Sequence, residues 1–125
     1  MASPVMIKEF ANTIYRTLGS GHSERVYHNA MEVILRKNNI AYESERILPI
    51  EFEGHTIGNM RADLIINKKL IVELKSVKVL TPAMNQQTIN YLNLTGLTEG
   101  LLVNFPLSAD SCEFAVIYRL PEKAE

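Results

Sequence analysis

Two acidic residues and one lysine, Asp63, Glu73 and Lys75, have the types and the spacing to form a catalytic site. Glu73 and Lys75 are two residues apart, so on a β-strand both side chains project from the same face. Apolar segments on either side of residues 67–69 predict two strands joined by a tight turn. With the turn centred near Lys68, Asp63 lies opposite Glu73 with Cβ atoms about 5 Å apart. The sequence therefore predicts three charged side chains on one patch of a hairpin.

Such a patch needs a partner that offsets the repulsion between the two acids. At an effective dielectric of about 20, carboxylates about 5 Å apart repel by roughly 3 kcal/mol, a large fraction of the stability of a small domain. Lys75 neutralises one charge, and Mg²⁺ or Mn²⁺ can bind the carboxylates together with waters and phosphate oxygens. The alternative is a solvated hairpin face on which Glu73 and Lys75 pair with neighbours. The apolar strand around Glu73 favours the metal site.

The elements around the hairpin follow from apolar spacing and from turn residues. Helical periodicity predicts helices over residues 4–18 and 23–37, and Thr81 and Gly96 are typical of the start and stop of a third. Strands are predicted over residues 42–52, 59–66, 70–76, 100–105 and 113–120. Pro49 indicates an edge position or a bulge, and residues 121–125 are expected to fray. Without a repeat or a linker, residues 1–125 are predicted to form a single domain.

Composition places the chain among ordinary globular proteins. It has 125 residues, of which 46% are hydrophobic and 22% charged. A single cysteine, Cys112, cannot form an internal disulfide, and the three histidines show no mutual ligand spacing, so we expect them at surface or packing positions. No apolar run of signal or membrane-spanning length is present. These features predict a cytoplasmic or otherwise intracellular protein without a membrane partner.

The formal net charge of −1 argues against a nucleic-acid partner, because phosphate binding usually shows itself as a basic surface. Catalytic carboxylates count against that total, however. Lys68, Lys69, Lys75 and Lys78 are close in sequence, and we expect them to gather beside the site. A local field of this kind matters more than the net charge.

Four motifs in order along the chain resemble the GxxExxY family. They are Gly21-His22-Ser23-Glu24-Arg25-Val26-Tyr27, Arg61-Ala62-Asp63, Val72-Glu73-Leu74-Lys75, and Gln87 followed by Tyr91-Leu92. The resemblance extends from Gly21 to Phe105. This family is assigned to the PD-(D/E)XK nuclease superfamily, and the Gln-x-x-x-Tyr helix is similar to that of RecB-type nuclease domains.

The resemblance implies an α/β, restriction-endonuclease-like fold, with a mixed central sheet flanked by helices. It implies that Asp63 and Glu73 are metal ligands, and that Lys75 orients or activates the hydrolytic water. By the same analogy Glu24 is a further metal-binding acid. Gln87 and Tyr91, which share a helix face at positions i and i+4, then line the opposite wall and contact substrate.

Some of these residues have a structural alternative. Glu24 lies near the predicted start of its helix and can cap it instead of serving the site. Tyr27, one turn later, is expected to pack with its hydroxyl hydrogen-bonded near the site. For Tyr91 both core packing and substrate contact remain open. Members of the family commonly carry a His-Glu pair where this chain has Met84-Asn85, a departure that weakens the transfer of full activity.

These observations support one leading function and two alternatives. The leading hypothesis is Mg²⁺-dependent hydrolysis of nucleic-acid phosphodiesters, with DNA as the substrate by family analogy and with Lys78 among the lysines that hold the backbone. The second is a catalytically degenerate binding or accessory module of nuclease fold, in which a protein partner, a homodimer or substrate shape supplies specificity. The third is a protein-interaction domain whose hairpin acids have no role.

Overall fold

The computed structural model describes residues 3–119 and contains eight helices and strands. The helices are α1 (Pro4–Leu18), α2 (Glu24–Lys37) and α3 (Pro82–Thr95); the strands are β1 (Tyr42–Phe52), β2 (His55–Ile66), β3 (Leu70–Lys75), β4 (Glu99–Asn104) and β5 (Glu113–Tyr118). This order is the one predicted. The largest difference in bounds is at β2, which begins at His55 rather than Asn59 because the preceding turn is tight. The prediction for residues 121–125 falls outside the described residues.

The helices begin and end at the residues that their sequence indicates. Ser23 and Thr81 are the N-caps of α2 and α3, and each side chain accepts a backbone N–H three residues later. Pro82 occupies the first turn of α3, and Gly96 ends it in the left-handed conformation with φ 77°. Between residues 3 and 119, no helix has the length and apolarity to cross a membrane.

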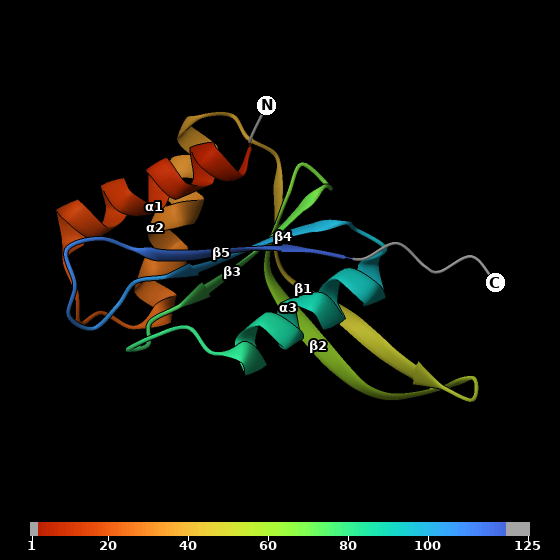
Figure 1. Cartoon of the computed structure of the whole chain (residues 1–125). Coiled ribbons are helices and arrows are strands. Elements are labelled where there is room, and N and C mark those ends of the chain that lie inside the picture. The colour runs from red at the N-terminus through yellow and green to blue at the C-terminus, as the bar shows by residue number, and fades with distance from the viewer. Residues whose placement is uncertain (1–2, 120–125) are drawn as a thin grey trace.

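The strands form one mixed sheet in the order β1-β2-β3-β4-β5. Only the β3–β4 pair is parallel, and α3 makes the crossover between these two strands. Helices α1 and α2 cover one face of the sheet and α3 covers the other (Figure 1). Each face has its own apolar core, with Tyr27 and Leu74 on the α1–α2 side and Ile71 and Leu92 on the α3 side. The mixed central sheet flanked by helices is therefore confirmed.

The hairpin of β1 and β2 extends beyond the body of the sheet (Figure 1). Pro49 lies in β1, which is an edge strand, and the pairing with β2 shifts register between Ile50 and Glu51. Pro49 thus lies on an edge strand and next to a bulge, the two positions in a sheet where proline is tolerated. Glu53 and Gly54 make the turn with positive φ, as two-residue hairpin loops of type I′ require.

The turn between β2 and β3 lies far from the carboxyl end of β3. Asn67 and Lys68 both have positive φ, and the Lys69 N–H donates to the Ile66 carbonyl over 2.9 Å. From this turn β3 runs five residue steps to Lys75, which is about 16 Å of extended chain. The expectation that four lysines gather beside the site is therefore wrong for Lys68 and Lys69, since a strand separates residues that are close in sequence.

A buried asparagine holds the loop that connects β3 to α3. Asn104 donates its amide to the Val77 carbonyl over 2.9 Å, and its side-chain oxygen accepts the Val77 N–H over 2.9 Å. Glu113 accepts both the Asn104 amide and the Leu80 N–H, over 3.1 and 3.0 Å. These bonds fix the loop to the ends of β4 and β5, and thereby the start of α3 relative to Lys75.

Candidate active site

Strands β2 and β3 separate at Asp63 and Glu73, and this place is called the fork. The ladder between β2 and β3 ends at the pair Leu64 and Val72, one position before these two acids. Beyond it, the Asp63 N–H donates to Glu73 Oε2 over 2.7 Å, and the Leu74 N–H donates to Asp63 Oδ2 over 2.8 Å. The two carboxylates thus replace the carbonyls of the ladder where the strands separate. Asp63 and Glu73 lie opposite each other, as the hairpin spacing predicts.

An unusual backbone conformation lies across from the fork on β1. The ladder between β1 and β2 includes the pairs Ser44–Leu64 and Arg46–Ala62 but omits Glu45, which has φ 56°. A non-glycine residue in this left-handed region is strained, and such residues concentrate at functional sites. The kink brings the Glu45 carboxylate to Arg25 on α2, with which it forms an ion pair.

Burial raises the free energy of the charged carboxylates at the fork. Glu73 is only 2% exposed, and its burial together with the adjacent Asp63 raises the pKa of its carboxyl from 4.5 to about 8. Burial also raises the pKa of Asp63, against the hydrogen bond from Leu74 and the charges of His28 and Lys75. Without a further cation, Glu73 therefore retains a proton near neutral pH. A cation at the fork would favour its charged form.

This protonation has a measurable consequence for stability. In EDTA, raising the pH from about 5 to about 8 is expected to lower the free energy of unfolding of the wild type. In this window the native state keeps a proton on Glu73 that the unfolded state has released, so the slope is negative, at most about 1.4 kcal/mol per pH unit. Urea denaturation across this range should show a flatter profile for Glu73→Gln, and parallel profiles would contradict the raised pKa.

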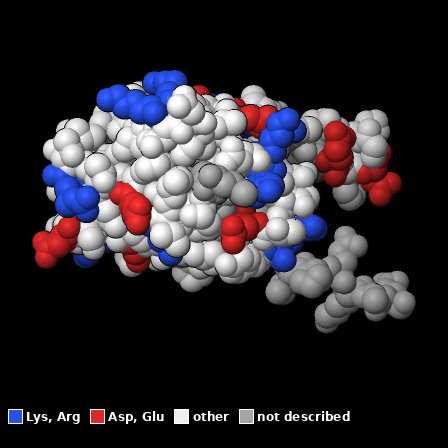
Figure 2. All heavy atoms as spheres, turned by 90° about the horizontal axis from the view of Figure 1, so that it is seen from above, with Lys and Arg blue, Asp and Glu red and all other residues white. Residues whose placement is uncertain are grey.

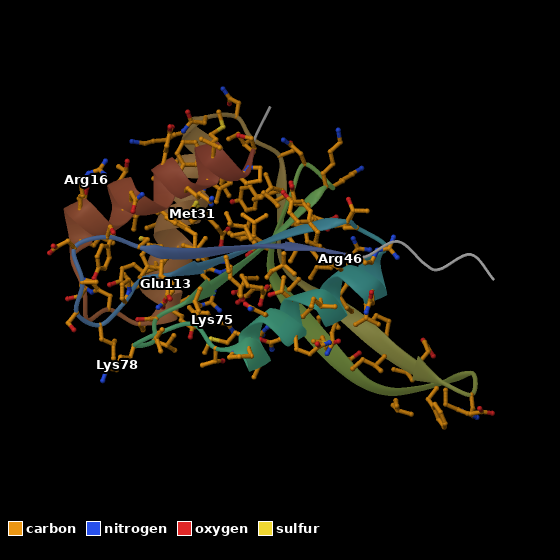
Figure 3. All side chains as sticks on the ribbon, viewed as in Figure 1. Arg16, Met31, Arg46, Lys75, Lys78 and Glu113 are labelled. Carbon is orange, nitrogen blue, oxygen red and sulfur yellow. The ribbon has the colours of Figure 1, made fainter. Side chains whose placement is uncertain are left out.

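Lys75 and two residues of α3 complete the fork on one face. The Lys75 ammonium donates to Gln87 Oε1 over 3.2 Å, and Figure 3 shows Lys75 between β3 and α3. Lys75 and Gln87 also line a hollow of about 550 Å³, the α3 hollow, which is otherwise formed by Thr81, Ala83, Met84, Gln86 and Asn90. Tyr91 is buried, and its hydroxyl favours the charged carboxylate of Glu73, against the larger effect of burial that raises the pKa of that group. The structure thus brings Gln87 and Tyr91 to Lys75 and Glu73.

A second, smaller hollow lies on the other face, between the fork and α2. This α2 hollow has a volume of about 160 Å³ and is lined by Glu24, Arg25, His28, Glu45, Arg61, Asp63 and Leu74. Glu24 therefore shares a hollow with Asp63, although its side chain is exposed. The cap of α2 is Ser23, which accepts the Val26 N–H over 3.4 Å. Of the two alternatives for Glu24, this geometry favours the site.

Two of the residues expected to support the site lie apart from the carboxylates. Tyr27 is fully buried, stacks on Phe105 with ring centroids 4.1 Å apart, and donates its hydroxyl to the Gly19 carbonyl over 2.6 Å. It therefore packs the loop before α2, as the structural alternative predicts. That loop contacts the end of β3 through Ser76, whose hydroxyl donates to the His22 carbonyl over 3.0 Å. Lys78 is exposed and points away from Lys75 (Figure 3).

His28 and Arg61 line the α2 hollow although neither is a predicted site residue. His28 was expected at a surface or packing position, and it is indeed packed, with Nε2 2.9 Å from both Ser44 Oγ and Glu32 Oε2. Its position four residues after Glu24 places both on one helix face, a signal that was present in the sequence. Arg61, two residues before Asp63 on the same strand, has the corresponding signal.

The donor set at the fork fits a hard cation that brings its own water ligands. Asp63 and Glu73 each use one oxygen in the backbone bridge and keep another for a further partner. Across residues 3–119, no three His, Cys, Asp or Glu side chains are arranged to hold a metal ion, so Glu24 does not complete a closed set with the two acids. Mg²⁺ is bound in this way by one or two carboxylates, waters and substrate phosphates.

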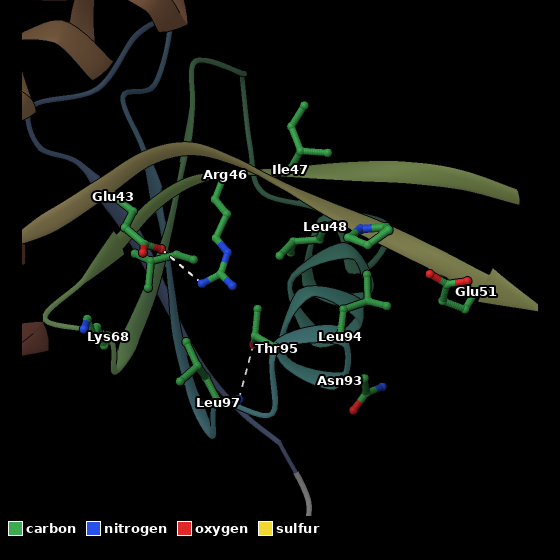
Figure 4. Close-up of a pocket in the computed structure, with 12 residues that line it drawn as sticks. Glu43, Arg46, Ile47, Leu48, Glu51, Lys68, Asn93, Leu94, Thr95 and Leu97 are labelled. Atoms are coloured by element: carbon green, nitrogen blue, oxygen red, sulfur yellow. Dashed lines mark hydrogen bonds and ion pairs between the residues drawn. The ribbon is translucent and has the colours of Figure 1, made fainter. Parts of the chain in front are cut away.

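A larger hollow lies elsewhere, between β1 and the carboxyl-terminal half of α3 (Figure 4). It has a volume of about 790 Å³, and its lining includes Lys68 but none of the residues predicted to be catalytic, metal-binding or supporting. Its charged groups include Arg46 and Glu43, which pair with each other over 3.2 Å. The ionisable groups with strongly raised pKa values at the fork, rather than this hollow, therefore mark the candidate site.

One face of the molecule carries no broad basic area. On the face shown in Figure 2, positive and negative side chains are interspersed, without an extended area of one sign. A nucleic-acid partner that approached this face would therefore find no extended basic area for its phosphates.

A mixed sheet that forks between two carboxylates, with a lysine two residues further on, defines a nuclease fold of the restriction-endonuclease-like class. The sequence matches the profile of the PD-(D/E)XK nuclease superfamily over residues 3–115, and the chain belongs to this family. The match confirms the superfamily and the fold that the motifs imply. It does not test the GxxExxY group or the individual site residues, which stay predictions.

Several solved structures are similar to this chain. SSO0001 is 25% identical to this chain, with a TM-score of 0.59. The match covers 79% of this chain, and this chain spans about half, 52%, of SSO0001. A phage related exonuclease from Haemophilus somnus 129PT is 14% identical, with a TM-score of 0.48 and coverage of 93% and 71% of the two chains. The alkaline exonuclease LHK-Exo from Laribacter hongkongensis is 12% identical, with a TM-score of 0.45 and coverage of 95% and 72%. No curated protein matches the sequence significantly.

Proposed function

We propose that this protein is a Mg²⁺- or Mn²⁺-dependent nuclease that hydrolyses phosphodiester bonds of nucleic acid, with DNA as the expected substrate. The observation that carries the proposal is the fork, where Asp63 and Glu73 share buried charge beside the ammonium of Lys75. Membership of the PD-(D/E)XK nuclease superfamily supports it. The arrangement of residues 21–27, 61–63 and 72–75 around one site further supports placing the chain in the GxxExxY group.

In this proposal each residue has a separate task. Asp63 and Glu73 would hold the cation, which would supply polarisation of a phosphate oxygen and a lower pKa for a water molecule. Lys75 positions that water and stabilises the negative charge that develops during attack. Gln87 accepts a hydrogen bond from Lys75 and thereby directs the ammonium, and the Tyr91 hydroxyl favours the charged form of Glu73. The hydrogen bonds from Asp63 and Leu74 keep the two acids from moving apart before substrate arrives.

A second function is favoured by two specific observations. One oxygen of each acid is already engaged by a backbone N–H, which suits a structural bridge between strands as well as a metal site. The start of α3 carries Met84-Asn85 where members of the GxxExxY family commonly have a His-Glu pair. Both features are compatible with a binding or accessory module of nuclease fold that does not cut, acting in a homodimer or with a protein partner.

The discriminating experiment combines cleavage with binding. Wild type and Glu73→Gln are incubated with fluorescently labelled single-stranded DNA, duplex DNA and RNA in Mg²⁺, Mn²⁺ or EDTA. We expect metal-dependent cleavage by the wild type and a loss of about a thousandfold in Glu73→Gln, which should fold because it resembles the protonated acid. Binding without cleavage would support the accessory module. Neither binding nor cleavage would favour a protein-interaction domain.

A further inference from the structure

The α2 hollow combines three carboxylates with two guanidinium groups. Glu24, Glu45 and Asp63 contribute the acids, and Arg25 and Arg61 are the cations among its lining residues. A nucleic-acid backbone that approaches the fork from this face meets a cluster of negative charge. Its phosphates require cations at the same place, because salt screens charges more than about 10 Å away. Lys68 and Lys69, at the far end of β3, are too distant to serve.

Arg61 is free to take a ligand. Its side chain is exposed and makes no hydrogen bond or ion pair with the rest of residues 3–119. It lies two residues before Asp63 on β2 and lines the same hollow. Arg25 is the main cause of the lowered pKa of Glu45, and the charge of Arg61 adds to it. Burial raises the pKa of Tyr91, and the charge of Arg61 opposes that rise, so the field of Arg61 reaches both β1 and the buried side of the fork. An arginine in this position stands at the entrance to the two acids.

Arg25 can bind a phosphate by exchanging its ion-pair partner Glu45 for it. It pairs with Glu45, but the two side chains are 54% and 33% exposed, and ion pairs of this kind contribute little stability in water. A phosphate group presents several charged oxygens to the planar guanidinium and accepts two parallel hydrogen bonds from it. It can therefore replace a solvated carboxylate as the partner of Arg25. Before a phosphate binds, Glu45 keeps the Arg25 side chain beside the hollow.

We propose that Arg61, assisted by Arg25, binds a phosphate of the nucleic-acid backbone next to the one that is cut. This inference rests on the proposed function and adds a substrate-binding subsite to it. Both arginines lie on the α2 face, whereas Lys75 and Gln87 lie on the α3 face. The substrate backbone is then held from the α2 side, and the hydrolytic water is positioned from the α3 side.

The test compares arginine variants that lose the same charge. Binding of fluorescein-labelled single-stranded DNA is measured by anisotropy in EDTA at several NaCl concentrations. Arg61→Gln is expected to raise Kd about tenfold, in line with the loss of one charged hydrogen-bonded contact. The slope of log K against log salt should fall by about 0.7, the value for one phosphate of a single strand. Arg61→Lys should keep the slope while losing affinity, because it keeps the charge without the bidentate geometry.

Arg16→Gln is the matched control, because it removes one exposed arginine, in the last turn of α1, that does not line the α2 hollow (Figure 3). It should leave both Kd and slope unchanged. If Arg61→Gln behaves like this control while the wild type cleaves, the subsite is wrong and the nuclease stands. If the slope depends on Arg61 but no nucleic acid is cut in Mg²⁺ or Mn²⁺, the subsite stands and the proposed hydrolysis is wrong. A wild type that binds no DNA overturns the subsite.

Discussion

Replacing Lys75 by methionine is expected to lower kcat for phosphodiester hydrolysis by about a thousandfold, the usual cost of removing one group that positions water or stabilises developing charge. Methionine fills a similar half-buried volume, so the fold should remain. Because Lys75 acts on the water rather than on the cation, KM should change much less than kcat. Steady-state kinetics with a fluorescent oligonucleotide measures both.

Lys69→Met provides the control for this variant. It removes the same charge from the turn between β2 and β3, about 16 Å of strand away from Lys75, so general electrostatic attraction of the substrate falls equally. We expect kcat close to that of the wild type. Equal activity of Lys75→Met and Lys69→Met would exclude Lys75 from the chemical step and leave the hydrogen bond with Gln87 as a packing contact.

Asp63→Asn is expected to abolish stabilisation of the fold by divalent cations. A cation that binds only the native state at a hundred times its Kd raises the free energy of unfolding by about 2.7 kcal/mol, which corresponds to several degrees in Tm for a domain of this size. Asparagine keeps the acceptor for the Leu74 N–H but removes the charge that the cation needs. Thermal unfolding at increasing Mn²⁺ and Mg²⁺ measures the difference.

Asp110→Asn makes the same chemical change on an exposed loop and should retain the full metal-dependent rise in Tm. Two results would contradict the prediction. A wild type whose Tm is independent of both cations would remove the metal site, and an unchanged rise in Asp63→Asn would place the cation elsewhere. Cleavage should be lost in Asp63→Asn together with the rise in Tm, whereas Lys75→Met should lose cleavage alone. The pair of variants therefore separates binding of the cation from the step that uses it.

Local sequence was sufficient to predict the elements and the centre of the candidate site. Caps such as Ser23 and Thr81 and the stop at Gly96 act within one helical turn, so their effect can be recognised without the rest of the fold. The pairing of Asp63 with Glu73 depends only on where the hairpin turns, and the shared face of Glu73 and Lys75 depends only on the two-residue period of a strand. These properties are short-range.

The surroundings of the site depend on contacts between segments far apart in the chain. The sequence could not show that the strands separate at Asp63 or that Glu73 is 2% exposed. Periodicity places His28 on the face of Glu24 and Arg61 on the face of Asp63, but only the packing of α2 on the sheet shows that these faces meet in one hollow. It also suggested a lysine cluster that β3 in fact divides. Spacing along one element determines which way a side chain points. Only the packing of α2 and α3 on opposite faces of the sheet decides which groups meet, how dry the carboxylates become, and therefore how far their pKa values rise.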